Sequence, residues 1–79
     1  MVEKIYIESQ CSDDKLRNLS VELEGMTLSF YGEYWNDDDV DEMYVLIPPQ
    51  IEKVKNLMHL EADSGSPDEV LRMLYKIVD

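Results

Sequence analysis

The sequence predicts an α+β fold in which an antiparallel four-stranded meander sheet is followed by two C-terminal helices, in the order ββββαα. Apolar and polar residues alternate through much of residues 1–47, which is typical of strands with one buried face. Beyond the proline pair at residues 48–49, apolar residues recur every three or four positions, which is typical of helices. Short connections between successive strands favour an antiparallel meander.

The first strand is predicted over residues 3–8, where Ile5 and Ile7 share one face. The following stretch, residues 9–17, is polar and predicts a loop. Within it, Ser12 is placed to cap a single helical turn.

The strongest local pattern predicts a β-hairpin whose loop is Glu24 and Gly25. With this loop, apolar residues face each other in three cross-strand pairs and polar residues in two. The predicted pairs are Leu23 with Met26, Val21 with Leu28, Leu19 with Phe30, Glu22 with Thr27, and Ser20 with Ser29. A shift of one residue would destroy this match, so the register and the turn support each other.

The second arm of the hairpin is expected to continue to Trp35, and an acidic loop follows. Residues 42–47 predict a fourth strand because they are rich in apolar and β-branched side chains. Pro48 and Pro49 end this strand, because proline has no backbone N–H to donate to the neighbouring strand. Pro49 also suits the first turn of a helix.

Two amphipathic helices are predicted after the sheet. The apolar stripe of the first helix consists of Ile51, Val54, Leu57 and Met58. A turn is predicted over residues 63–66, and the second helix is expected to start at Ser66-Pro67-Asp68-Glu69, a serine cap followed by proline and acids. Its apolar stripe consists of Val70, Leu71, Leu74, Tyr75, Ile77 and Val78.

Length and charge predict a single small acidic domain over residues 1–79. The net charge is −11, and residues 1–48 contain 12 acidic and 3 basic residues. This charge would repel nucleic acid and anionic membranes, so direct binding of either is not expected. The lone Cys11 and the lack of an apolar export or membrane-spanning run lead us to expect a cytoplasmic protein.

The ten-residue window 33–42 is the candidate binding site. It holds six carboxylates, no base and the sole tryptophan of the chain. The residues predicted to contact a partner are Tyr31, Glu33, Tyr34, Trp35, Asp37, Asp38, Asp39, Asp41 and Glu42. Strand alternation predicts that Tyr31, Glu33 and Trp35 share the polar face of the sheet. The alternatives are a solvated turn that protects a sheet edge, and a Trp35 buried under a helix.

No metal, cofactor or catalytic site is expected. Asp37, Asp39 and Asp41 have the spacing that opens a calcium loop, but Glu42 stands where glycine is required, and Pro48 where a bidentate Glu is required. His59 lacks a partner at any known catalytic spacing. The acidic neighbours of Cys11 at Asp13 and Asp14 are expected to raise its pKa and lower its reactivity. The chain is therefore not expected to be an enzyme.

These patterns predict a small protein-binding module for a basic protein partner. An inhibitor or immunity-type protein of bacterial or phage type, masking a partner that handles nucleic acid, fits this charge and size. The alternative is a structural or regulatory homo-oligomer, in the simplest case a homodimer formed through the apolar fourth strand or the last helix.

Overall fold

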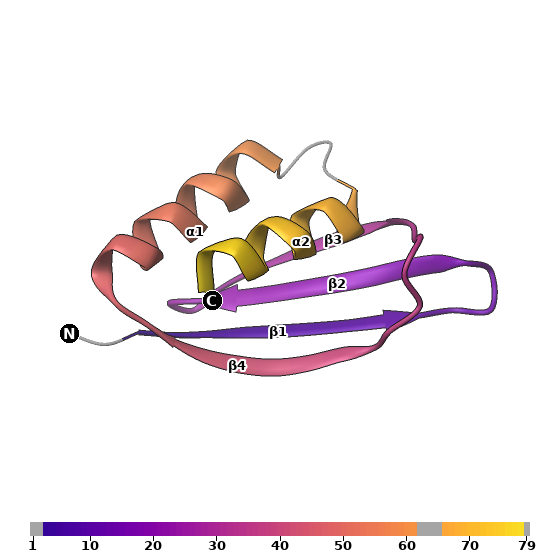
Figure 1. Cartoon of the computed structure of the whole chain (residues 1–79), viewed down its shortest axis with the longest axis horizontal. Helices are drawn as coiled ribbons and strands as arrows, with labels where there is room; N and C mark the ends of the chain where they lie inside the picture. The colour runs from indigo at the N-terminus through magenta and orange to yellow at the C-terminus, as the bar shows by residue number, and fades with distance from the viewer. Residues whose placement is uncertain (1–2, 62–65, 79) are drawn as a thin grey trace.

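The computed structural model describes residues 3–61 and 66–78 and has the predicted α+β architecture (Figure 1). Four antiparallel strands are followed by two helices, in the order ββββαα. The elements are β1 (Glu3–Cys11), β2 (Leu16–Leu23), β3 (Met26–Glu33), β4 (Val40–Leu46), α1 (Pro48–Glu61) and α2 (Pro67–Val78). The predicted turn over residues 63–66 lies largely outside the described residues.

The strands lie in the order β3-β2-β1-β4. The first three strands form the predicted meander. The fourth strand does not pair with β3, because the chain crosses over the end of the sheet and β4 pairs with β1. This arrangement is a Greek key, in which the fourth strand returns to lie beside the first. Both edges of the sheet are therefore formed by the strands that flank the acidic window.

The predicted loop over residues 9–17 is mostly strand, which corrects the sequence-based interpretation. β1 continues to Cys11 and β2 starts at Leu16, so only residues 12–15 connect them. The Ser12 hydroxyl donates to the Leu16 carbonyl at 3.2 Å, which closes a tight hairpin turn instead of a helical turn. Polar residues occur in these strands because sheet pairing and buried partners compensate for their low hydrophobicity.

The hairpin around Glu24 and Gly25 has the predicted register in all five cross-strand pairs. Both loop residues have positive φ, 54° for Glu24 and 79° for Gly25. These angles are those of a type I′ turn, whose twist matches the twist of the flanking strands.

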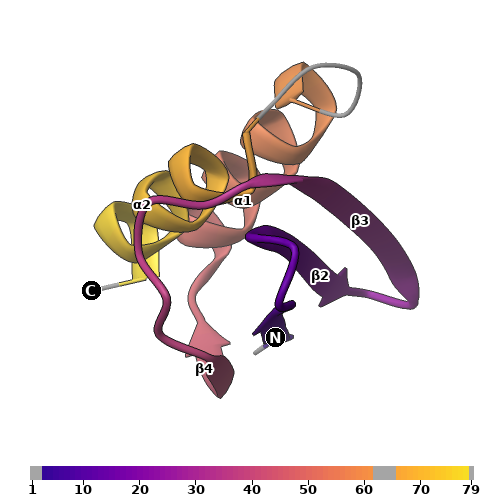
Figure 2. The same cartoon turned by 90° about the vertical axis from the view of Figure 1, so that its right-hand side faces the viewer.

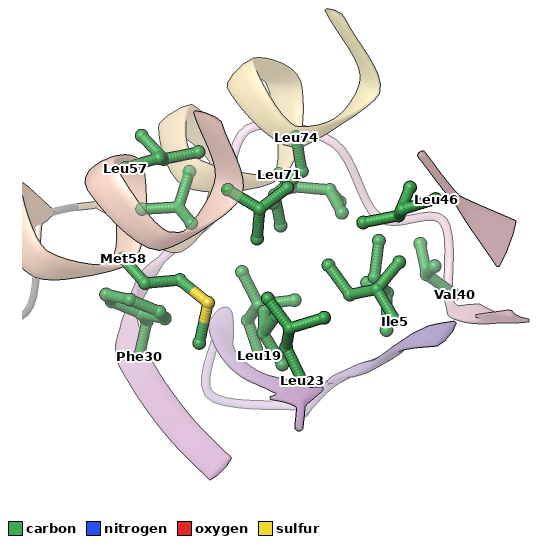
Figure 3. Packing of buried hydrophobic residues seen from close by; sticks show 14 of the residues in the cluster. Ile5, Leu19, Leu23, Phe30, Val40, Leu46, Leu57, Met58, Leu71 and Leu74 are labelled. Atoms are coloured by element: carbon green, nitrogen blue, oxygen red, sulfur yellow. The ribbon is translucent and has the colours of Figure 1, made fainter. Parts of the chain in front are cut away.

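The helices cover one face of the sheet, as Figure 2 shows. This face carries Ile5, Ile7, Leu19, Val21, Leu23 and Phe30, all buried. Figure 3 shows Met58 of α1 and Leu71 and Leu74 of α2 turned toward these strand residues. The predicted stripes on both helices thus supply the second half of the core. The opposite face of the sheet is not covered by any element in the described part of the chain.

Three further strand boundaries differ from the prediction by one or two residues. β3 ends at Glu33 and not at Trp35, and β4 begins at Val40 and ends at Leu46. Helix α1 starts at Pro48, separated from the end of β4 by one residue, as the proline pair indicates. Within the described ranges, neither helix is long and apolar enough to cross a membrane.

We predict that Gly25→Ala lowers the free energy of unfolding by about 1 kcal/mol, because a side chain disfavours left-handed φ. A Cβ at position 25 would have no atom within 4 Å, so the loss would reflect backbone conformation alone. Urea unfolding followed by circular dichroism measures this difference. Gly25→Asn is the control and should stay closer to the wild type, since asparagine tolerates this conformation. Equal stability of the Ala and wild-type proteins would contradict the assigned turn.

Candidate partner-binding surface

A buried ion pair lies at the end of the sheet where the acidic window crosses. Arg17 is fully buried on the helix-covered face, and its Nε lies 2.6 Å from Oδ1 of Asp68 at the start of α2. Its Nη1 donates to the Ser9 hydroxyl at 2.6 Å, and its Nη2 donates to the Asn36 carbonyl. The ring of Tyr34 lies 6.0 Å from the guanidinium carbon. The guanidinium thus has its ion-pair partner on α2 and hydrogen-bond acceptors on β1 and in the segment after β3.

Asp68 also holds the connection between β3 and β4, residues 34–39, against α2; we call this connection the crossing segment. Its Oδ2 accepts the backbone amides of Trp35 at 2.6 Å and Asn36 at 3.2 Å. A carboxylate in the first turn of a helix is also stabilised by the helix dipole. These bonds end β3 and turn residues 34–36 over the sheet end.

Sequence reasoning missed this ion pair. Asp68 was interpreted only as part of a helix start, and Arg17 as a loop residue. The alternation of Leu23, Val21 and Leu19, continued back by two residues, places Arg17 on the same buried face. An arginine on a buried face requires a buried acidic partner. The position of Arg17 in the alternation is therefore the signal from which the ion pair could have been predicted.

The structure gathers acidic side chains from several segments at one end of the sheet, which we call the acidic end. The end of β1 and the segment 34–39 meet there, as the bond from the Cys11 amide to Asp39 Oδ1 at 3.2 Å shows, and the short β1–β2 turn follows directly after Cys11. In Figure 1 both lie at the right-hand end of the sheet. The acidic end consists of Glu8, Asp13, Asp14, Glu33, Asp37, Asp38, Asp39, Asp41 and Glu42, all exposed. On the described strands and turns of this end, Lys15 is the one exposed base.

The predicted aromatic residues are separated by the fold. Tyr31 is 67% exposed and lies on the open face with Glu33, as predicted. Trp35 is 64% exposed but does not share that face, because β3 ends at Glu33 and Asp68 binds the Trp35 amide. It lines a hollow of about 190 Å³ together with Leu71 and Tyr75 of α2.

Tyr34 is half-buried over Arg17, so its ring covers the buried ion pair. The exposed aromatic side chains of the predicted site are therefore Tyr31, on the uncovered face of the sheet, and Trp35, beside α2.

Several carboxylates of the acidic end have local hydrogen-bond donors. The Tyr6 hydroxyl lies between Asp41 Oδ1, at 2.5 Å, and Glu8 Oε2, at 3.0 Å. The Tyr44 hydroxyl donates to Glu42. These bonds reduce the repulsion between neighbouring acids on the sheet.

Asp37 and Asp38 differ from these residues. The Asp38 amide donates to Asn36 Oδ1 at 3.0 Å, which shapes the loop. Within the described residues, the carboxylates of Asp37 and Asp38 themselves have no donor and face solvent. They are the acids most available to an external cation.

Two pKa values at this end are shifted upward. Hydrogen bonding to Asp41, and then to Glu8, raises the pKa of Tyr6 well above its ordinary value. Burial raises the pKa of the Cys11 thiol; Arg17 opposes this, and Asp39 adds to it. The direction for Cys11 is as expected from the sequence, but the acids involved come from the crossing segment and α2 and not from Asp13 and Asp14.

No group of His, Cys, Asp and Glu side chains in the described ranges is arranged to hold a metal ion. No protein-family model matches the chain, and comparison with curated proteins and with solved structures also finds no match. The function must therefore be argued from the geometry and charge of the surface itself.

We predict that Arg17→Met lowers the free energy of unfolding by about 3–5 kcal/mol, because Asp68 is left as an unpaired buried charge. A domain of this size has about that much stability, so this variant should show no cooperative urea transition. The double variant Arg17→Met/Asp68→Asn removes both charges and keeps an oxygen acceptor for the Trp35 and Asn36 amides. It should regain a cooperative transition. A stable Arg17→Met single variant would show that the pair is not the constraint we describe.

We predict that Tyr6 stays protonated at a pH where an ordinary tyrosine, with a pKa near 10, ionises. Because the folded pKa is raised, the interaction stabilises the fold below pH 10, and this stabilisation is lost as the pH rises through the folded pKa. Tyrosinate absorbance, compared between wild type and Tyr6→Phe, isolates this group. Asp41→Asn is the matched variant and should bring the Tyr6 titration back toward pH 10. A Tyr6 titration near pH 10 in the wild type would refute the contact.

Proposed function

We propose that the chain is a protein-binding module whose acidic end masks a basic surface on a partner that handles nucleic acid. The observation that carries this proposal is the convergence of exposed carboxylates from separate segments onto one end of the sheet. Such a surface resembles a row of phosphates in charge, and it attracts the Arg and Lys side chains that contact phosphate. An inhibitor or immunity-type role follows from occupying those side chains.

The proposed contact has two parts. Asp37 and Asp38 supply charges that speed association and select a basic partner. Trp35 supplies the apolar anchor, because a large exposed aromatic side chain beside a hollow is a frequent centre of binding energy. The hollow next to Trp35, between the crossing segment and α2, has room for a partner side chain.

The proposal does not include catalysis, a cofactor or direct nucleic-acid binding. The charge of −11 opposes contact with phosphate backbones and anionic lipids. The module would act by covering the basic surface of its partner, so it would compete with nucleic acid for that surface.

We predict that a basic protein is retained from lysate of the source cell by the immobilised wild type at about 0.05 M salt and released at about 0.5 M, because salt screens the charges. A variant with Asp37, Asp38 and Asp39 changed to Asn should lose this retention. The control changes Glu3, Glu22 and Glu52 to Gln, which alters the net charge equally but away from the acidic end, and it should retain the protein. Equal retention of the basic protein by both variants would show that the acidic end is not the binding site.

The purified partner then allows the anchor to be tested. Trp35→Ala should weaken binding more than any single Asp→Asn substitution, since single exposed charges contribute little. Addition of nucleic acid should displace the module from its partner. A partner that binds nucleic acid and the module at the same time would contradict masking.

A further inference from the structure

The outer edge of β3 is unusual for this chain because all but its last residue, Glu33, is uncharged. Residues 26–32 contain no charged residue and no proline, although 32% of the whole chain is charged. The other edge strand, β4, carries Asp41 and Glu42. Exposed edge strands present unpaired backbone groups, and proteins commonly protect them with charge or proline. Residues 26–32 lack both protections, and in Figure 2 β3 forms the outer margin of the sheet.

An apolar groove runs beside this same edge. It has a volume of about 690 Å³ and lies between β3 and the second half of α1. Met26 and Leu28 of β3 and Met58 of α1 contribute its apolar lining. Met26 is 52% exposed although it belongs to the inward-facing side of the hairpin. The edge therefore combines free backbone groups with apolar surface that no element in the described residues covers.

We propose that β3 pairs with β3 of a second copy of this chain, antiparallel and about a twofold axis at Ser29. This register uses the whole uncharged run and keeps inward-facing residues opposite inward-facing residues. Leu28 then faces the partner's Phe30, and Thr27 faces the partner's Tyr31. Met26 faces the partner's Gly32. The two sheets become one continuous sheet.

Charge placement favours this edge over β4. Pairing through β3 leaves β4 and most of the acidic end of each copy at the two outer margins of the joined sheet, because β4 lies at the opposite edge. Two chains of charge −11 then meet along residues 26–32, which carry no charge. Pairing through β4 would instead bring Asp41 and Glu42 of both copies into the interface. The stripe of α2 is also unsuitable, since Val70, Leu71 and Leu74 are already buried in the core.

Sedimentation velocity of the purified full chain tests the proposal. We expect a species of twice the 9.2 kDa chain mass, whose population rises with salt because screening weakens repulsion between like-charged copies. This salt dependence is opposite to that expected for the basic partner, so the two proposals fail independently. A monomer at all concentrations and salt levels would overturn the inference.

Two substitutions distinguish a dimer that forms through β3 from a dimer that forms through β4. Ser29→Lys places like charges opposite each other at the axis and should raise the dimer dissociation constant several-fold without changing the circular dichroism spectrum. Val45→Lys adds the same charge to the exposed face of β4, where the side chain is 61% exposed, and should leave the dimer intact. Dissociation by Val45→Lys alone would assign the interface to β4 and refute the β3 pairing.

The register is tested by cross-linking. In a Cys11→Ser background, Ser29→Cys should form an intermolecular disulfide under mild oxidation, because residues at the axis lie directly opposite each other. Glu22→Cys lies on the same open face but on β2, and it should remain a thiol. Equal cross-linking of both variants would mean random collision and would overturn the register.

Discussion

The buried pair of Arg17 and Asp68 is the constraint on which the arrangement of the three structural parts depends. A fully buried guanidinium is tolerated only when its charge and its donors have partners. Here the partners come from β1, from the crossing segment and from α2. The sheet, the crossing segment and the helical layer can therefore satisfy this charge only when all three are in place. The position of the acidic end is a consequence, since Asp68 also binds the backbone at Trp35 and Asn36.

Features that depend on local sequence were predictable. The hairpin at Glu24–Gly25 and the helix starts at Pro48 and Pro67 follow from turn chemistry and from periodicity, which act over a few residues. The strand order and the burial of Arg17 were not predictable in this way. Both depend on pairing between segments far apart in the chain, and a polar stretch such as residues 9–17 looks like a loop until its partners are known.

The candidate site was likewise predictable where it depends on local sequence and not where it depends on long-range pairing. The window 33–42 was found because its acids are contiguous, and Tyr31, Trp35 and Asp37 to Asp39 are indeed exposed. Asp13 and Asp14 were not assigned to the binding site, because only the Greek-key path brings this part of the chain to the same end of the sheet as the window. The pairing of Tyr6 with Asp41 is likewise a product of the β1–β4 register. A surface assembled from two stretches far apart in the sequence, residues 8–14 and 33–42, can be recognised only once the topology is known.

The strand order also has a consequence for how the chain folds. β1, β2 and β3 are joined by tight turns, so their pairing closes only short loops and costs little chain entropy. β4 pairs with β1, and the chain between these two strands contains β2, β3 and the crossing segment. This pairing therefore closes the longest loop in the sheet. Long-range pairing of this kind slows folding. The acidic crossing segment lies within that loop, and the repulsion among its carboxylates opposes closure. The rate at which the fourth strand docks should therefore respond to ionic strength more than the formation of the two hairpins does.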